Sequence, residues 1–418
     1  MFRENSNRLR LFLAEFLVCL AMLICFTSCE ECFVSNSSIG PSFFPVVSIE
    51  TSDGKPVTNK EIYLNAYVSI THADSINDLF DSIMIKGRGN STWSAPKKPY
   101  ALKFYRKRAV LSLPENKSWI LLANYYDKTL LRTTVGFFLG GMSLLDYTTR
   151  FYNVNLYINK EYRGIYQLGE KIKVGKDRLN IGDDGFILEV DWKYNKDEVL
   201  FRTQHLKHPI NIKSPEVVYN DSSYLYVKDY VNKAESALYA DNFTDLDEGY
   251  RKYMDIYSFV EYYVIHEIAK SLDAPFYTSC YMNMSRNGKL KMGPVWDFDL
   301  SFGNSGSAGG KTFDNPQGFY IKNQYWYIRL FEDPSFVDLV KTRFNDYYER
   351  RQAIYDMIDS ESAIIKKHIL EDNKLWGRLC SKNSSEETVQ QAYQKEVDAL
   401  KDWIETRFIW LHALINVL

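Results

Sequence analysis

Two aspartates interrupt an otherwise apolar stretch, GPVWDFDLSFG, at residues 293–303. A carboxylate buried among such side chains costs several kcal/mol unless its charge is compensated. If residues 295–300 form a strand, Asp297 and Asp299 lie on the same face, about 7 Å apart, where both could bind one divalent cation through their oxygens. The alternative is that each acid caps a turn beside a loop, and these residues alone favour neither interpretation.

A glycine-rich turn followed by basic residues, GRGNSTWSAPKKPYALKF, occupies residues 87–104. The glycines that flank Arg88 allow backbone amides to approach an anion, and an arginine can hold phosphate through two parallel hydrogen bonds. In the strand expected at residues 100–104, Lys103 points away from the apolar face, so it is either a solvated lysine or a phosphate contact. The glycine spacing is that of neither a Walker loop nor a dinucleotide-binding fingerprint.

Glu170 ends the strand expected at residues 164–170 and shares its face with aromatic and aliphatic side chains. A carboxylate on such a face needs a cation, and Lys103 or Arg88 is available to provide it. The alternative is a glutamate that is simply exposed at the end of its strand.

Asp273 lies where a helix must stop. The apolar stripe of the helix expected at residues 246–270 turns Glu267 inward, and Pro275 prevents the helix from continuing. Asp273 therefore projects from a loop, where catalytic groups are commonly found, although an acid that only stops a helix is the alternative. His266, in the last turn of this helix, is expected at the surface.

The N-terminus has the pattern of a secretory signal. Basic residues precede an apolar run at residues 16–26, which is too short to span a bilayer, and small residues follow directly before Cys29. This pattern resembles a bacterial lipoprotein box, so we expect residues 1–28 to be removed, Cys29 to carry lipid and residues 29–44 to form a tether. The alternative is a plain signal peptide that is cut elsewhere. The acidic pair at residues 30–31 resembles the export signal of surface lipoproteins in the Bacteroides group.

The composition is that of an ordinary globular protein. The 418 residues are 45% hydrophobic and 25% charged with a formal net charge of −2, so no overall field favours a nucleic-acid partner. Without the signal, Cys32, Cys280 and Cys380 remain beside Cys29. Their number and wide spacing match neither a disulfide framework nor a zinc site.

Strand and helix patterns follow one another along the chain. Apolar alternation and turn signals predict strands at residues 46–50, 62–68, 83–88, 100–104, 152–158, 164–170 and 185–191. Apolar content and helical periodicity predict helices at residues 118–140, 223–239, 246–270, 333–352 and 386–416. Strands first, a mixed middle and helices last favour an α+β fold. We expect one domain at residues 45–330, with residues 331–418 as a helical part packed on the same core.

Five stretches carry a family resemblance in their combination and order: GRGNSTWSAPKKPYALKF, ANYYDKTLLRT, YRGIYQLGEKIKV, SLDAPFYTSCYMNM and GPVWDFDLSFGN. Together they resemble the CotH family, the spore-coat-protein-H-like atypical protein kinases. The resemblance covers roughly residues 45–330, and RGNSTW…PKKPY and WDFD are its most specific parts. It implies a distant protein-kinase-like fold with an N-terminal β-rich lobe and a C-terminal helical lobe.

The resemblance also implies roles for individual residues. Asp273 would be the catalytic-loop aspartate, and Asp297 and Asp299 would bind Mg²⁺ or Mn²⁺. The residues expected at the ATP phosphates, with Glu170 as ion-pair partner, are Arg88, Lys97, Lys98 and Lys103. Sporulation members carry an asparagine-rich stretch after the catalytic aspartate, where an asparagine would be a second metal ligand. Here Ala-Pro-Phe follows Asp273, and the first asparagine is Asn283.

Two functions from different classes follow. The first is a lipid-anchored kinase of the cell envelope, at the outer membrane or cell surface of a Gram-negative bacterium, which phosphorylates Ser or Thr of a protein. Its partners would be that protein substrate and, through the anchor, a membrane, with no nucleic acid. The second is a catalytically inactive surface module that uses the same fold for binding or adhesion.

Overall fold

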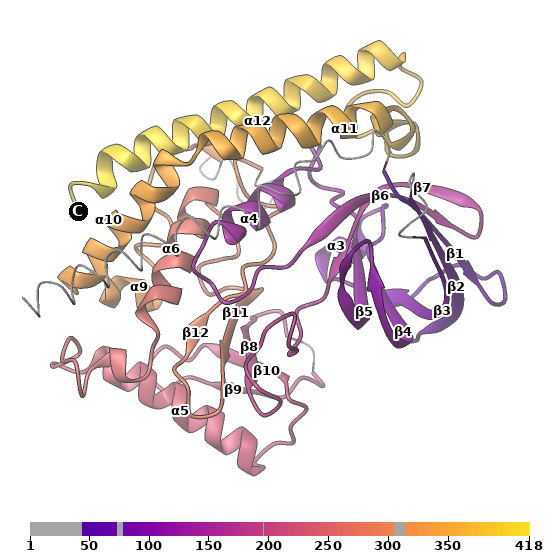
Figure 1. The fold of residues 1–418 in the computed structure, drawn as a ribbon. Helices are drawn as coiled ribbons and strands as arrows, with labels where there is room; N and C mark the ends of the chain where they lie inside the picture. The colour runs from indigo at the N-terminus through magenta and orange to yellow at the C-terminus, as the bar shows by residue number, and fades with distance from the viewer. Residues whose placement is uncertain (1–43, 73–77, 195, 305–313) are drawn as a thin grey trace, which may run out of the picture. The chain divides into compact units, whose positions relative to one another are not determined.

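A computed structural model of the chain describes residues 44–72, 78–194, 196–304 and 314–418. The predicted signal at residues 1–28, Cys29 and the tether up to residue 43 lie outside the described residues. Pro45–Leu418 forms one compact unit of mixed strands and helices, so the expected α+β class is confirmed (Figure 1). None of the described helices combines the length and apolar character needed to cross a membrane.

The first strands of the unit close into a barrel in the order β1-β2-β3-β4-β5-β7-β6 (Figure 1). Their bounds are Val46–Thr51 (β1), Leu64–Thr71 (β2), Leu79–Gly87 (β3), Tyr100–Val110 (β4), Leu113–Leu122 (β5), Phe151–Ile158 (β6) and Glu161–Glu170 (β7). Neighbouring strands are antiparallel, except that β1 runs parallel to β6 and so closes the barrel. A closed barrel leaves no unpaired strand edge.

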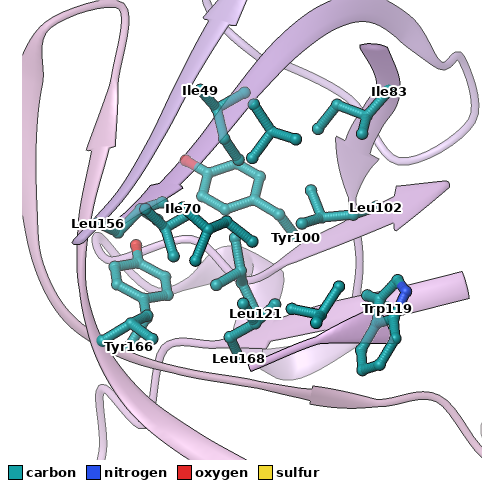
Figure 2. Close-up of a cluster of buried hydrophobic side chains, with 14 of the residues drawn as sticks. Ile49, Ile70, Ile83, Tyr100, Leu102, Trp119, Leu121, Leu156, Tyr166 and Leu168 are labelled. Atoms are coloured by element: carbon teal, nitrogen blue, oxygen red, sulfur yellow. The ribbon is translucent and has the colours of Figure 1, made fainter. Parts of the chain in front are cut away.

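Side chains fill the interior of the barrel. Val47 and Ile49 of β1 are buried while their neighbours are more exposed, which is the alternation expected of a strand with one face on a core. Figure 2 shows aliphatic side chains gathered around the rings of Tyr100, Trp119 and Tyr166. The interior is therefore a packed core, as in other small barrels, and the binding cavity lies elsewhere.

The rest of the unit is a second sheet covered by helices. The sheet has the order β12-β11-β8-β10-β9, with bounds Phe186–Val190 (β8), Leu200–Arg202 (β9), Pro209–Ser214 (β10), Cys280–Met284 (β11) and Lys291–Met292 (β12). The helices are Ser91–Ser94 (α3), Arg132–Gly141 (α4), Ser222–Tyr239 (α5), Ile256–Ala269 (α6), Tyr325–Leu330 (α9), Pro334–Glu349 (α10), Gln352–Trp376 (α11) and Glu386–Ile415 (α12).

Helix α6 is enclosed on all sides. Every residue from Ser258 to Ala269 is buried, which is typical of a helix in the centre of a protein rather than at its surface. His266 is buried as well, and the expectation that it lies at the surface is wrong for this reason. Glu267 points inward, as predicted, and pairs with the buried Arg407 of α12 at 2.7 Å.

The predicted helix at residues 118–140 is wrong over most of its length. Residues up to Leu122 belong to β5, and only Arg132–Gly141 is helical. Trp119 and Leu121 face the barrel core, but Ile120 on the other face is buried too. A strand buried on both faces loses the alternation that distinguishes it from a helix.

Buried charges join the barrel to α11. The Lys97 ammonium lies 2.8 Å from a carboxylate oxygen of Asp372 and donates to the carbonyl of Ile165 at 2.6 Å. Arg378 pairs with the other oxygen of Asp372 at 2.7 Å. Burial alone would raise the pKa of Asp372, but Lys97 and Arg378 lower it to about 2. The three side chains therefore form an ion-pair network across the junction.

Candidate active site

A cavity of about 440 Å³ opens between the loop after β3, the segment after β5 and the second sheet. This volume falls within the range of about 300–1,000 Å³ that is usual for small-molecule sites. The charged residues that line it are Arg88, Lys97, Glu189, Asp191, Lys193, Glu198, Lys213, Asp273, Asp297 and Asp299. Five of the residues predicted for the site are thus in one place.

Asp273 lies in the loop that follows α6, where the helix-stop pattern predicts it. The helix ends at Ala269, and the main-chain carbonyl of Asp273 accepts hydrogen bonds from the amides of Tyr277 and Thr278, at 3.2 and 3.4 Å. These bonds hold the loop in a tight turn. The Asp273 side chain lines the cavity from that turn.

The electrostatic surroundings of Asp273 suit a proton acceptor. Burial, followed by the nearby Asp297 and Asp191 carboxylates, raises the pKa of Asp273 to about 6, while the Lys193 ammonium opposes the change. A carboxylate with a pKa near the working pH is basic enough to take a proton and is still ionised at pH 7.

The segment that carries Asp297 and Asp299 is not a strand. Residues 293–298 have no regular secondary structure, and Asp297 has a φ of 66°, in the left-handed region. The ring of Phe298 stacks on His266 of α6 with centroids 5.0 Å apart and also lies 5.9 Å from Phe137 of α4, and Trp296 packs on the same Phe137 at 5.6 Å. The apolar residues of this segment therefore pack against both α6 and α4.

Two glycines of α4 make room for this segment. Gly136 and Gly140 are four residues apart and so lie on one face of the helix. A Cβ atom at Gly136 would lie 2.2 Å from the ring of Phe298, and one at Gly140 would lie 2.9 Å from Val295. The close approach of α4 fixes the segment beside the cavity and with it the two aspartates.

Asp297 and Asp299 are close enough to share a hydrogen bond between their carboxyl groups. Burial, followed by the charge of Asp297 and by that hydrogen bond, raises the pKa of Asp299 well above its ordinary value, and Asp127 and Asp273 add to the effect. Ser279 donates a hydrogen bond to Asp297 at 3.0 Å. Like charges in a buried position require a proton or a cation between them.

This donor set fits a divalent cation that is shared with a ligand. Among the described residues, no three His, Cys, Asp or Glu side chains converge as a complete metal site. Mg²⁺ usually keeps several waters and is held by one or two carboxylates together with substrate phosphates, so a pair of aspartates is the arrangement expected for it.

Arg88 lines the cavity on the side of the barrel. Its guanidinium lies 5.8 Å from the centroid of the Trp296 ring. Burial lowers the pKa of Arg88, while Tyr281, Asp297 and Glu189 partly offset this effect. A planar cation beside the two aspartates is well suited to a phosphate group.

The glycines around Arg88 have a packing role. A Cβ atom at Gly87 would lie 2.3 Å from the ring of Trp93, and one at Gly89, where φ is 87°, would lie 2.1 Å from the hydroxyl of Thr92. They let the short helix α3 fold back against the loop that carries Arg88.

The other basic residues predicted at the phosphates are held by other groups or lie outside the cavity. Lys97 reaches the wall of the cavity, but its ammonium is held by Asp372. Lys98 donates a hydrogen bond to the carbonyl of Trp93 at 2.7 Å. Lys103 is exposed on the outer face of β4. Lys98 and Lys103 are not among the residues that line the cavity.

Glu170 also lies outside the cavity, and the ion pair expected with Lys103 or Arg88 is wrong. Its carboxylate pairs with Arg150 at 2.8 Å and lies 3.6 Å from Arg178. The hydroxyl of Tyr147 donates to it at 3.0 Å. These partners come from the segments that flank β6 and β7, so Glu170 fastens the end of the barrel.

An ion pair that was not predicted from the sequence also lines the cavity. Glu189 of β8 lies 3.1 Å from Lys213 of β10, which also pairs with Glu198 at 2.7 Å. Burial raises the pKa of Glu189 to about 7, although Lys213 opposes this. The signal was present, because Glu189 interrupts the apolar strand FILEV in the same way that Asp297 interrupts its own segment.

Asn283, the first asparagine after Asp273, does not reach this cavity. It is buried in β11, where its amide donates to the carbonyl of Gly293 at 3.0 Å. It lines a smaller cavity of about 120 Å³. It therefore does not replace the asparagine that follows the catalytic aspartate in sporulation kinases.

Comparison with known proteins adds one finding. A family model described as CotH kinase protein matches residues 85–411, a range that contains every residue discussed in this site. No curated protein matches the chain.

Proposed function

The chain belongs to the CotH kinase protein family, and we propose that it is a lipid-anchored kinase of the cell envelope that transfers phosphate from a nucleotide to Ser or Thr of a protein. One observation carries this proposal: Asp273, Asp297, Asp299 and Arg88 converge on one cavity. Phosphoryl transfer needs this combination of cations around phosphate, acids for a metal and an acid for the acceptor.

The proposal includes a two-lobed, distantly kinase-like arrangement. The barrel would be the N-terminal β-rich lobe and the second sheet with its helices the C-terminal lobe. The position of the cavity supports this, since its lining comes from the loops after β3 and β5 and also from β8, β10 and the loop after α6.

Asp297 and Asp299 would hold Mg²⁺ or Mn²⁺ together with the phosphates of ATP. A bound divalent cation neutralises charge on the phosphate oxygens and so favours attack on the γ-phosphorus. Arg88, which lines the cavity beside Asp297, would donate two hydrogen bonds to phosphate oxygens. Asp297 and Asp299, which repel each other without a counter-ion, are stabilised once positive charge lies between them.

Asp273 would orient the acceptor hydroxyl and take its proton. The hydroxyl oxygen forms a bond to the γ-phosphorus while the bond from that phosphorus to the β–γ bridging oxygen breaks, and the nucleoside diphosphate leaves with the electron pair. The raised pKa of Asp273, about 6, allows it to accept the proton near neutral pH and to release it to solvent afterwards.

Thermal unfolding with ATP and Mn²⁺ tests the site. A ligand at a hundred times its Kd stabilises a protein by about 2.7 kcal/mol, so the wild type should melt at a higher temperature when both are present. Asp297→Asn should lose most of this shift, while Asp338→Asn on the exposed side of α10 should retain it. The absence of any shift in the wild type would favour the inactive binding module instead.

The lipid anchor is a separate part of the proposal. It is supported by the small residues before Cys29 and the acidic pair after it. Mass spectrometry of the mature N-terminus should find a diacylglycerol-modified Cys29. A soluble product that begins beyond this residue would contradict the anchor and leave the kinase proposal untouched.

A further inference from the structure

Four lysines gather on the outside of the barrel next to the cavity, and we call this set the lysine face: Lys86, Lys103, Lys171 and Lys173. None of the four lines the cavity. They come from three segments, namely β3, β4 and the residues that follow β7.

Strand register places the first two together. Lys86 pairs in register with Ala101, and Lys103 pairs with Met84. Lys86 and Lys103 are therefore diagonal neighbours on one face of β3 and β4, where such residues lie about 7–8 Å apart. The inward face of both strands belongs to the barrel core, so the two lysines point outward.

Packing fixes the positions of Lys171 and Lys173. In the stretch Lys171-Ile172-Lys173-Val174, Ile172 and Val174 pack against a buried apolar cluster, whereas Lys171 and Lys173 are exposed. Arg178 then donates to the carbonyl of Ser118 at 2.9 Å.

The hydrogen bond from Arg178 to Ser118 places residues 171–174 beside Lys103. Ser118 of β5 is the residue that pairs in register with Lys103 of β4. The segment after β7 is thus held against the outer side of β4 and β5, and Lys173 and Lys103 act on each other electrostatically.

No ion pair with an acid is formed by any member of the lysine face among residues 44–72, 78–194, 196–304 and 314–418. Desolvation, followed by the cations Lys173, Arg88, Lys213 and Lys86, lowers the pKa of Lys171 to about 8. Desolvation and the neighbouring Lys103 and Arg178 also lower the pKa of Lys173. Lysines that are grouped without acids between them cost stability, so packing alone does not explain why they are grouped.

We propose that the lysine face binds an acidic segment of the protein substrate and so presents a nearby Ser or Thr to Asp273. This inference rests on the proposed kinase function and names a substrate class for it. Arg88 connects the two places, because it lines the cavity beside Asp297 and also acts on Lys171. A polypeptide can span from one to the other, since an extended chain covers about 3.3 Å per residue.

Charge complementarity at such a surface acts mainly on encounter rate and specificity. The interaction is exposed, so salt should weaken it as the screening length falls from about 8 Å at 0.15 M to about 3 Å at 1 M. A substrate that carries acidic residues near its acceptor would be selected over a neutral one.

The test is fluorescence anisotropy with a labelled peptide in which aspartates and glutamates flank one serine. A matched peptide carries asparagine and glutamine at the same positions. The wild type should bind the acidic peptide at least tenfold more tightly than the neutral one at low salt. Lys86→Glu combined with Lys173→Glu should remove about tenfold of this affinity. Lys395→Glu, on the exposed side of α12, is the matched control and should bind as the wild type does.

Phosphate transfer to the same peptides completes the test. The double variant should raise KM for the acidic peptide about tenfold and leave kcat/KM for the neutral peptide unchanged. Equal binding of both peptides by the wild type, or equal acidic-peptide binding by the double variant, would overturn the inference. Binding of the wild type to phosphatidylglycerol vesicles but not to the acidic peptide would also overturn the inference. Intact acidic-peptide binding with no transfer to any peptide would support the lysine face and count against the kinase.

Discussion

At the junction between barrel and α11, a buried acid lies between two cations, whereas in the cavity three partly buried acids, Asp273, Asp297 and Asp299, lie near one another. Asp372 lies between Lys97 and Arg378, at 2.8 and 2.7 Å, and its pKa is lowered to about 2. In the cavity, by contrast, the pKa values of Asp273 and Asp299 are raised, to about 6 and well above the ordinary range.

The two places differ in role: the ion pairs at the junction stabilise the fold, whereas the acids in the cavity belong to the candidate active site. Removing one partner of a complete ion pair leaves a buried charge uncompensated, so the junction holds two parts of the fold in register. The neighbouring acids of the cavity make the fold less stable, and under the proposed function a bound divalent cation would supply positive charge between them. Three substitutions probe this contrast.

The largest expected effect is on the rate of phosphate transfer, from a substitution in the cavity. Asp273→Asn should lower the rate of phosphate transfer by about 10²–10⁴-fold, because a positioned acid–base group contributes about that much. The measurement is transfer of labelled phosphate from ATP to a Ser/Thr peptide, with the melting temperature recorded alongside. An intact fold and nucleotide shift should accompany the loss. Equal rates in variant and wild type would remove Asp273 from the mechanism.

The next effect is expected at the junction. Lys97→Met should lower the free energy of unfolding by about 3 kcal/mol, since Asp372 would keep Arg378 as its cation but lose Lys97. Urea denaturation measures this change. Lys98→Met is the control, because the Lys98 ammonium donates its hydrogen bond to the main-chain carbonyl of Trp93 in α3 and pairs with no acid of α11. A variant of Lys97 with unchanged stability but weaker ATP binding would instead support the phosphate role predicted from sequence.

The smallest effect concerns pH. The pKa of Asp299 is raised in the folded state from an ordinary value of 3.8, so the folded protein binds more protons than the unfolded one, and stability falls as pH rises above about 4. Asp299→Asn removes this dependence. In the presence of a chelator the variant should melt about 2 °C above the wild type at pH 8 and together with it at pH 4. A wild type whose melting temperature rises between pH 4 and pH 8 more than that of the variant would contradict the assignment.

Local patterns predicted much of the fold. Strands such as β1 and β6 alternate cleanly because only one of their faces is buried. Local patterns do not identify a strand that is buried on both faces, as in β5, or an apolar segment that packs against helices without regular structure of its own, as at residues 293–298. Helix α11 went unpredicted as a separate element, although the helical character of residues 331–418 was expected.

The acids of the candidate site could be predicted from the sequence for a simpler reason. An acid inside an apolar run is visible in the sequence, and it identified Asp297 and Asp299, just as it would have identified Glu189. The partners of buried cations were not visible. Lys97 pairs with Asp372, which lies 275 residues further along the chain. No local pattern indicates which distant residue a buried lysine will pair with.

The closing strand of the barrel has a mechanical consequence. Strand β1 is hydrogen-bonded to β2 on one side and to β6 on the other, so tension applied through the residues that precede it must break both ladders together. Forced unfolding is governed by the rate of such a rupture rather than by equilibrium stability. If the proposed tether at residues 29–44 holds the protein, a force on the chain would therefore act on β1, where two rows of hydrogen bonds resist it together. The cavity, which is lined by the loops after β3 and β5, would stay intact while these bonds hold.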